Sequence, residues 1–121
     1  MAETTSDVLS ELRDRIRQFA SERDWDQFHT PKNLAVALSV EAAELLEPFQ
    51  WLPTGSDSEL NDFKRQQIRH EIADVLIYLI RLSDKLNIDL ACAVRDKLAL
   101  NAEKYPAERV RGSALKYSER D

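Results

Sequence analysis

The sequence is poor in residues that interrupt or cross-link a chain. Its 121 residues include two glycines, four prolines and one cysteine, whereas 43% of them are apolar. So little glycine disfavours a fold of many tight turns, and this length and composition predict one compact helical domain with a modest core. The single cysteine, Cys92, excludes an internal disulfide and fits a reducing compartment. Because it lies within an apolar helical pattern, we expect it to be a small core residue and not a nucleophile.

Long apolar runs and blocks of basic residues are also absent. The longest apolar run, residues 75–80, is far too short to cross a membrane, and the acidic N-terminus lacks the order of a signal peptide. The net charge is -5, and the basic residues are dispersed among acids, which argues against a nucleic-acid surface. We therefore expect a soluble, cytoplasmic protein that binds neither membranes nor nucleic acids.

The segment Ile68–Leu86 is predicted to be the central helix, because apolar residues recur there at steps of three and four with no glycine or proline between them. Two acids lie on its apolar face: Glu71 and Asp74 project only about 60° apart, at roughly 100° per residue. Buried carboxylates need a metal, a basic partner or protons to compensate their charge.

The helix expected at residues 34–47 repeats this arrangement, since Glu41 and Glu44 fall on its apolar stripe. The local sequences match as well: E-A-A-E-L-L at residues 41–46 corresponds to E-I-A-D-V-L at residues 71–76. Two such helices side by side would direct four carboxylates to one point. A set of oxygen ligands without His or Cys suits Mg²⁺ or Mn²⁺ better than Zn²⁺. The alternative is a buried ion network in which Lys85, Lys97 or Lys104 neutralises the acids.

The remaining helices and loops are predicted from helix-capping residues and from residues that interrupt helices. We expect a first amphipathic helix at residues 6–24, an aromatic connector at residues 25–31, and a helix opened by Thr30 and Pro31. The aromatic residues of the connector are expected to form a hydrophobic plug, or alternatively one wall of a pocket for a flat ring. Ser58 or Asp57 is expected to cap the lead-in to the central helix. Asp89 is expected to cap a fourth helix, which should end at Tyr105–Pro106. This divides the chain into a domain at 1–106 and a charged tail at 107–121, flexible or ordered only against a partner.

Three motifs in this order resemble a known family. They are the E-x-x-E of residues 41–44, the E-x-x-D of residues 71–74 and K-x-x-x-N-x-x-K-Y-P at residues 97–106. Together they resemble the MazG-like all-α nucleoside triphosphate pyrophosphohydrolases, and E-R-D-W-D-Q-F-H-T-P-K-N (residues 22–33) with F-Q-W (49–51) is similar to the dCTP pyrophosphatase branch. The resemblance, which covers about residues 12–106, implies a four-helix bundle-like protomer that forms a homodimer or a dimer-of-dimers tetramer. It also implies Mg²⁺-dependent hydrolysis of nucleotides to the monophosphate and pyrophosphate.

The resemblance assigns roles to particular residues. Glu41, Glu44, Glu71 and Asp74 would hold Mg²⁺, with Mn²⁺ as a substitute, and one of them could act as general base. Phosphate oxygens would be held by Asn101, Lys104 and Tyr105, with Lys85 as a further candidate. Trp25 and Trp51 would stack on the base, and Tyr78 would lie near the sugar.

One position departs from the pattern, and other functions stay open. Vertebrate members of this branch place a His where this chain has Ile16, which leaves the base preference open. The sequence thus favours a house-cleaning enzyme for dCTP or a modified dCTP. The alternatives are a dUTP diphosphatase or a phosphoribosyl-ATP pyrophosphohydrolase on the same scaffold, or a non-catalytic helical interaction module.

Overall fold

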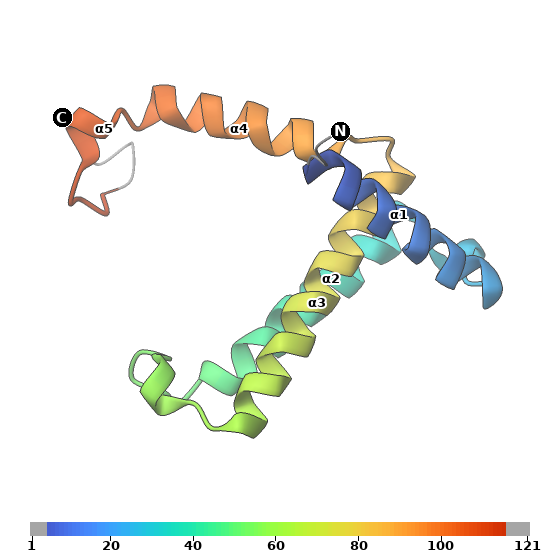
Figure 1. The fold of residues 1–121 in the computed structure, drawn as a ribbon, viewed down its shortest axis with the longest axis horizontal. Coiled ribbons are helices and arrows are strands. Elements are labelled where there is room, and N and C mark those ends of the chain that lie inside the picture. The colour runs from blue at the N-terminus through green and yellow to red at the C-terminus, as the bar shows by residue number, and fades with distance from the viewer. Residues whose placement is uncertain (1–4, 116–121) are drawn as a thin grey trace. The chain divides into compact units, whose positions relative to one another are not determined.

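The structure is a computed structural model that describes residues 5–115, with side-chain environments from residue 8 onward. Within this range it contains helices and no strand, which confirms the all-α prediction (Figure 1). The α-helices are α1 (Thr5–Glu22), α2 (Pro31–Leu46), α3 (Asp62–Lys85), α4 (Leu90–Lys104) and α5 (Ala107–Val110), and the 3-10 helices are η1 (Asp26–Phe28), η2 (Glu47–Phe49) and η3 (Asp57–Glu59).

The chain divides into two compact units, Met1–Ile88 and Asp89–Asp121, and each is described by itself. The first unit contains α1, α2 and α3, and the second contains α4 and α5. The short helix α5 lies within the predicted tail, whose residues 116–121 are outside the described range. The division at residue 106 stays a prediction.

In the first unit, α2 and α3 run antiparallel along each other, and α1 crosses one end of the pair (Figure 1). Contacts at both ends fix this direction. At one end Arg81 of α3 binds Asp26, just before α2, and at the other Lys64 Nζ donates to the carbonyl of Pro48, just after α2, over 3.2 Å. The antiparallel pairing brings the middle of α2 against the middle of α3, where the two acidic motifs lie.

Arg17 and Asp84 attach α1 to α3. The guanidinium of Arg17 donates two hydrogen bonds to the Asp84 carboxylate, the one from Nε over 2.9 Å. This pair holds the pKa of Asp84 below its usual range, because the carboxylate accepts hydrogen bonds from a fixed cation. A charged contact therefore joins α1 to α3, beside the other contacts between these helices.

The predicted caps are right for two helices and wrong for the central one. Thr30 accepts a hydrogen bond from the Asn33 N–H, and Asp89 accepts one from the Cys92 N–H, as expected of N-cap residues. The central helix is capped by Asn61, not by Ser58 or Asp57. The reason is that the extended backbone at Leu60 separates η3 from α3.

The predicted first helix also ends early, at Glu22 and not at residue 24. Asp24 has a φ of 54°, in the left-handed region that an α-helix cannot continue through. The chain turns there, and the Gln27 side-chain amide donates to the Asp24 carbonyl over 3.0 Å. Trp25 follows directly, so this turn determines the position of its backbone.

The hydrophobic core of the described residues is small. Its buried apolar residues are Ala20, Leu34, Ile80 and Ala91. Large apolar side chains are exposed on both paired helices: Val36, Val40 and Leu46 on α2, and Ile72, Leu76 and Ile77 on α3. The expectation that Cys92 is a core residue is wrong, because this residue is exposed on α4. The protomer by itself leaves much apolar surface uncovered.

None of the helices in the described part of the chain has the length and apolar character needed to cross a membrane. The cytoplasmic location stays a prediction.

Candidate functional site

Three of the four predicted metal ligands meet between α2 and α3. Glu41, Glu44 and Glu71 each provide a carboxylate oxygen, and these three oxygens lie within 4.8 Å of one another. All three side chains are half-buried. Glu41 and Glu44 are one helical turn apart on α2, and Glu71 comes from the facing helix, so the antiparallel pairing assembles the group.

Among residues 5–115, no basic side chain compensates the charge of this acid cluster. In the part of the chain that the structure describes, no ion pair joins a basic side chain to any of the three acids. One oxygen each of Glu41 and Glu71 is buried without a hydrogen-bond partner. Buried polar atoms are usually satisfied, and an orphaned carboxylate oxygen is costly. The cluster therefore has unused capacity to bind a cation or a proton.

The electrostatics of Glu41 reflect this lack of compensation. Burial raises the pKa of Glu41 from 4.5 to about 7, and hydrogen bonding with Glu44 and Glu71 and the negative charges of Glu44 and Asp74 act in the same direction. Near neutral pH this carboxyl group is therefore close to half-protonated when no cation is bound. A divalent cation would favour its ionised form.

Asp74, the fourth predicted ligand, lies beside the cluster and is not one of the three residues whose oxygens converge. It is half-buried, and its charge contributes to the raised pKa values of both Glu41 and Tyr78. Burial is the main cause for Tyr78, followed by the charges of Glu41, Asp74 and Glu44. Asp74 and Tyr78 therefore share the electrostatic environment of the acid cluster.

The residues present fit a hard divalent cation. Their ligand atoms are all carboxylate oxygens, and oxygen ligands suit Mg²⁺ or Mn²⁺. Two of these residues, Glu41 and Glu71, each have a buried oxygen without a partner. A carboxylate site of this kind leaves coordination positions for water and for phosphate oxygens. In an internal ion network the buried carboxylate oxygens would be paired with basic groups. The unpartnered oxygens of Glu41 and Glu71 therefore favour a cation site over such a network.

Lysine neutralisation by Lys85 is excluded by the geometry. Lys85 Nζ is bound to the carboxylate of Asp26. Lys97 and Lys104 lie on α4 in the second unit, which is described separately from the acids. Within the first unit, the acids therefore have no lysine partner among the described residues.

The predicted ring-binding residues are partly exposed. Trp25 is 44% exposed, Trp51 is 86% exposed, and Phe28 is also exposed. The interpretation of the aromatic connector as a hydrophobic plug is therefore wrong for Trp25 and Phe28. It forms the short helix η1, and His29 at its end is half-buried. Exposed indole faces remain available for stacking.

Three predicted phosphate-binding residues lie at the end of α4. Asn101 and Tyr105 are half-buried, and the Tyr105 N–H donates to the Asn101 carbonyl over 2.7 Å. Lys104 Nζ lies 5.7 Å from the centroid of the Tyr105 ring. These residues are grouped in the second unit, whereas the acids belong to the first.

Sequence reasoning missed one buried charge, Arg81 of α3, which is 4% exposed. Its guanidinium donates to Asp26 Oδ1 over 2.7 Å, to His29 Nδ1 over 3.1 Å and to Asp84 Oδ2 over 3.5 Å. Helical spacing, the pattern that identified the acids, could have found it. Arg81 lies seven residues after Asp74 and so on the same face of the helix.

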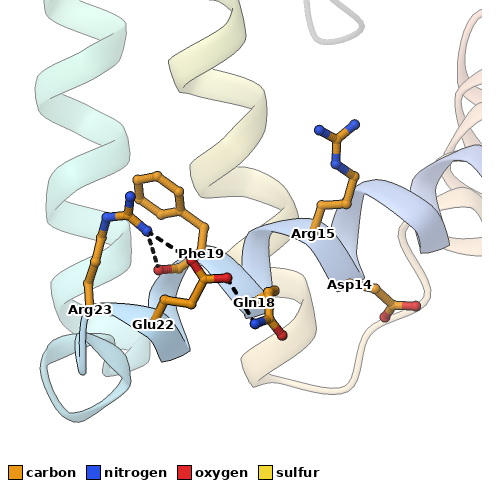
Figure 2. Close-up of a pocket in the computed structure, with 6 residues that line it drawn as sticks. All are labelled: Asp14, Arg15, Gln18, Phe19, Glu22 and Arg23. Carbon is orange, nitrogen blue, oxygen red and sulfur yellow. Dashed lines mark hydrogen bonds and ion pairs between the residues drawn. The ribbon is translucent and has the colours of Figure 1, made fainter.

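A shallow hollow of about 390 Å³ lies on the outer surface of α1 (Figure 2). The residues that line it belong to α1 or follow it directly: Asp14, Arg15, Gln18, Phe19, Glu22 and Arg23. Figure 2 shows Arg23 over the Phe19 ring, with 3.6 Å between the guanidinium carbon and the ring centroid. None of the predicted site residues lines this hollow.

Comparisons with known proteins show the family of this chain. Residues 36–119 match the MazG-like family, and the chain belongs to that family. It is similar to dCTP pyrophosphatase 1 of Homo sapiens, with 42% identity over 114 residues that cover 93% of this chain and 67% of that protein. The protein of the same name from Bos taurus is 40% identical over 114 residues, with 93% and 68% covered. The crystal structure of a pyrophosphatase from Archaeoglobus fulgidus superposes with a TM-score of 0.76 at 42% identity, covering 88% of this chain and 99% of that one.

Proposed function

We propose that this chain is a Mg²⁺-dependent nucleotide pyrophosphohydrolase that converts dCTP, or a modified dCTP, to the monophosphate and pyrophosphate, and so serves nucleotide-pool sanitation. The observation that carries the proposal is the acid cluster. It holds two buried carboxylate oxygens without partners, in a chain of the MazG-like family that is 42% identical to dCTP pyrophosphatase 1. An inert helical module would have no reason to keep such costly groups.

The cation would be held by Glu41, Glu44 and Glu71, with Asp74 beside them. A divalent cation bound there would neutralise triphosphate oxygens and make a water molecule more acidic. Asp74, which is not one of the three convergent acids, would be the carboxylate of this set left to accept a proton from water.

The other predicted residues would orient the nucleotide. Trp25 and Trp51 offer exposed indole faces for the base, and Tyr78 is half-buried one turn after Asp74, where a sugar could lie. Asn101, Lys104 and Tyr105 would hold phosphate oxygens through their amide, ammonium and hydroxyl groups. Contacts of this kind to phosphate oxygens would orient the triphosphate for attack at one phosphorus.

Purified protein incubated with Mg²⁺ and dCTP is expected to release dCMP and pyrophosphate. The measurement is a product-resolved assay across the canonical and several modified nucleotides, with dUTP and phosphoribosyl-ATP included. EDTA should abolish turnover, because the triphosphate and the acid cluster would then repel each other. Orthophosphate as the first product would refute the reaction type, and a faster reaction with dUTP would refute the base preference.

We further propose that the active protein is a homo-oligomer, either a dimer or a dimer-of-dimers tetramer. The support is physical: the protomer exposes large apolar side chains along both α2 and α3, whereas its described core contains four buried apolar residues. Large apolar side chains exposed in such number on paired helices are typical of surfaces that a partner subunit covers. Light scattering at micromolar concentration is expected to give at least twice the protomer mass of 13.9 kDa, and a monomeric mass would contradict the proposal.

A further inference from the structure

Arg81 connects the central helix to the turn that carries Trp25. Its Nη2 donates to Asp26 and its Nε donates to His29, so the guanidinium holds the residue after Trp25 and the residue that closes the turn. Asp26 is held a second time, by Lys85. His29 has no other side-chain hydrogen bond among the described residues. Arg81 is therefore the group that fixes the His29 ring.

The Trp25 ring rests on the groups that Arg81 positions. It makes a T-shaped contact with the His29 ring, with 6.5 Å between centroids, and another with the Phe19 ring, with 5.7 Å between centroids. The Trp25 N–H donates to the Ala20 carbonyl over 2.9 Å, which fixes its backbone at the end of α1. The Trp25 indole thus contacts two rings, Phe19 and His29, and its orientation depends on both.

The same face of α3 links this turn to the acid cluster. Asp74, Tyr78 and Arg81 follow one another at steps of four and three residues, so their side chains project from one face. At 1.5 Å of rise per residue, Asp74 and Arg81 are about 10 Å apart along the helix axis. One rigid helix therefore carries an acid, an aromatic side chain and the anchor of the Trp25 turn.

We propose that Arg81 is a positioning residue for substrate binding, which sets the Trp25 ring against the nucleotide base by fixing His29 and Asp26. The inference rests on the proposed function, because it takes Trp25 as the wall on which the base stacks. It adds that base affinity depends on a buried arginine that touches no substrate. A guanidinium is suited to this task, since its fork holds two acceptors in a fixed geometry.

Arg81→Met tests this role, and Arg17→Met is the matched control. After Arg81→Met, Asp26 keeps Lys85 and Asp84 keeps Arg17, so neither carboxylate loses its last partner. Arg17→Met removes a guanidinium from the same charged network without touching Asp26 or His29. We expect Arg81→Met to raise the KM for dCTP roughly tenfold, the size typical of residues that orient a binding group, with kcat changed less than about threefold. Arg17→Met should change neither quantity.

Trp25→Ala separates this inference from the function on which it rests. It should raise KM by a similar factor, and the double variant should raise it no further, because both changes remove the same ordered ring. A KM unchanged in Trp25→Ala would mean that this ring does not bind the base, which refutes the assignment in the proposed function. A raised KM in Trp25→Ala with an unchanged KM in Arg81→Met, or additive effects in the double variant, would overturn the role of Arg81.

A measurement without turnover completes the test. In a Trp51→Phe background, the fluorescence of Trp25 is expected to shift and to become more accessible to acrylamide after Arg81→Met but not after Arg17→Met. If Arg81→Met does not fold, Arg81→Lys is used in its place. It keeps a positive charge beside Asp26 but cannot hold two acceptors in the same geometry, so we expect a fluorescence change in the same direction but smaller. Unchanged fluorescence in the folded variant would overturn the proposal whether or not the protein hydrolyses nucleotides.

Discussion

Glu41→Gln is expected to lower kcat for pyrophosphate release by about 10²–10³-fold, the cost of removing one preorganised electrostatic group from an active site. Glu41 contributes an oxygen to the group of three acids, and one of its two oxygens is buried without a partner. The amide keeps the size of the side chain but removes a negative ligand. The loss should therefore appear in turnover and in Mg²⁺ affinity, measured by a pyrophosphate assay and by calorimetric titration with Mg²⁺.

Glu47→Gln is the matched control for this variant. Glu47 lies six residues further along the chain, is exposed, and is not one of the convergent acids. The same chemical change there should leave kcat and Mg²⁺ affinity as in the wild-type protein. If Glu41→Gln retained near-normal turnover while Glu47→Gln did too, the assignment of the metal ligands would be wrong.

The metal-free protein is expected to become less stable as the pH rises from about 5 to 8. Burial raises the pKa of Glu41 from 4.5 to about 7, so between these values the folded state binds more protons than the unfolded state. The free energy of unfolding then decreases with rising pH, because stability increases with pH only where the unfolded state holds more protons. This contribution is fully present below about pH 4.5 and is lost as the pH rises through 7.

The size of this effect is about 1–3 kcal/mol, since one pKa unit corresponds to about 1.4 kcal/mol and solvent at a half-buried carboxyl reduces the full value. The measurement is urea unfolding in EDTA across this pH range, for the wild-type protein and for Glu41→Gln. The neutral amide should remove the dependence and make the metal-free variant the more stable protein at pH 8.

The comparison with the variant isolates Glu41 from other titrating groups. His29, whose pKa is lowered by burial and by the charges of Arg81 and Lys85, contributes the opposite trend in both proteins and cancels in the difference. Adding Mg²⁺ should stabilise the wild-type protein most at high pH, where the ligands are ionised. Parallel pH profiles for the two proteins would show that Glu41 titrates normally.

Much of the fold followed from local sequence. Thr30 and Asp89 cap their helices as their side-chain chemistry predicts, and the scarcity of glycine agrees with a described chain that contains only helices and loops. The central helix was placed by its apolar period, but its first residue was not. The backbone at Leu60 is extended, so the helix can begin only after it, and Asn61 is its N-cap. The N-cap position therefore depends on the backbone conformation of the residues before the helix.

Acids on apolar helical stripes were visible in the sequence, because each stripe depends only on spacing along one helix. That the oxygens of Glu41, Glu44 and Glu71 meet depends on antiparallel packing of α2 on α3, which spacing does not specify. The side chain of Arg81 was not identified at all, since its partners Asp26 and His29 are more than fifty residues away in the chain. Sequence alone determined that these acids lie on the apolar stripes of α2 and α3. Tertiary structure decided which of them meet, because burial, repulsion and ion pairing act between helices.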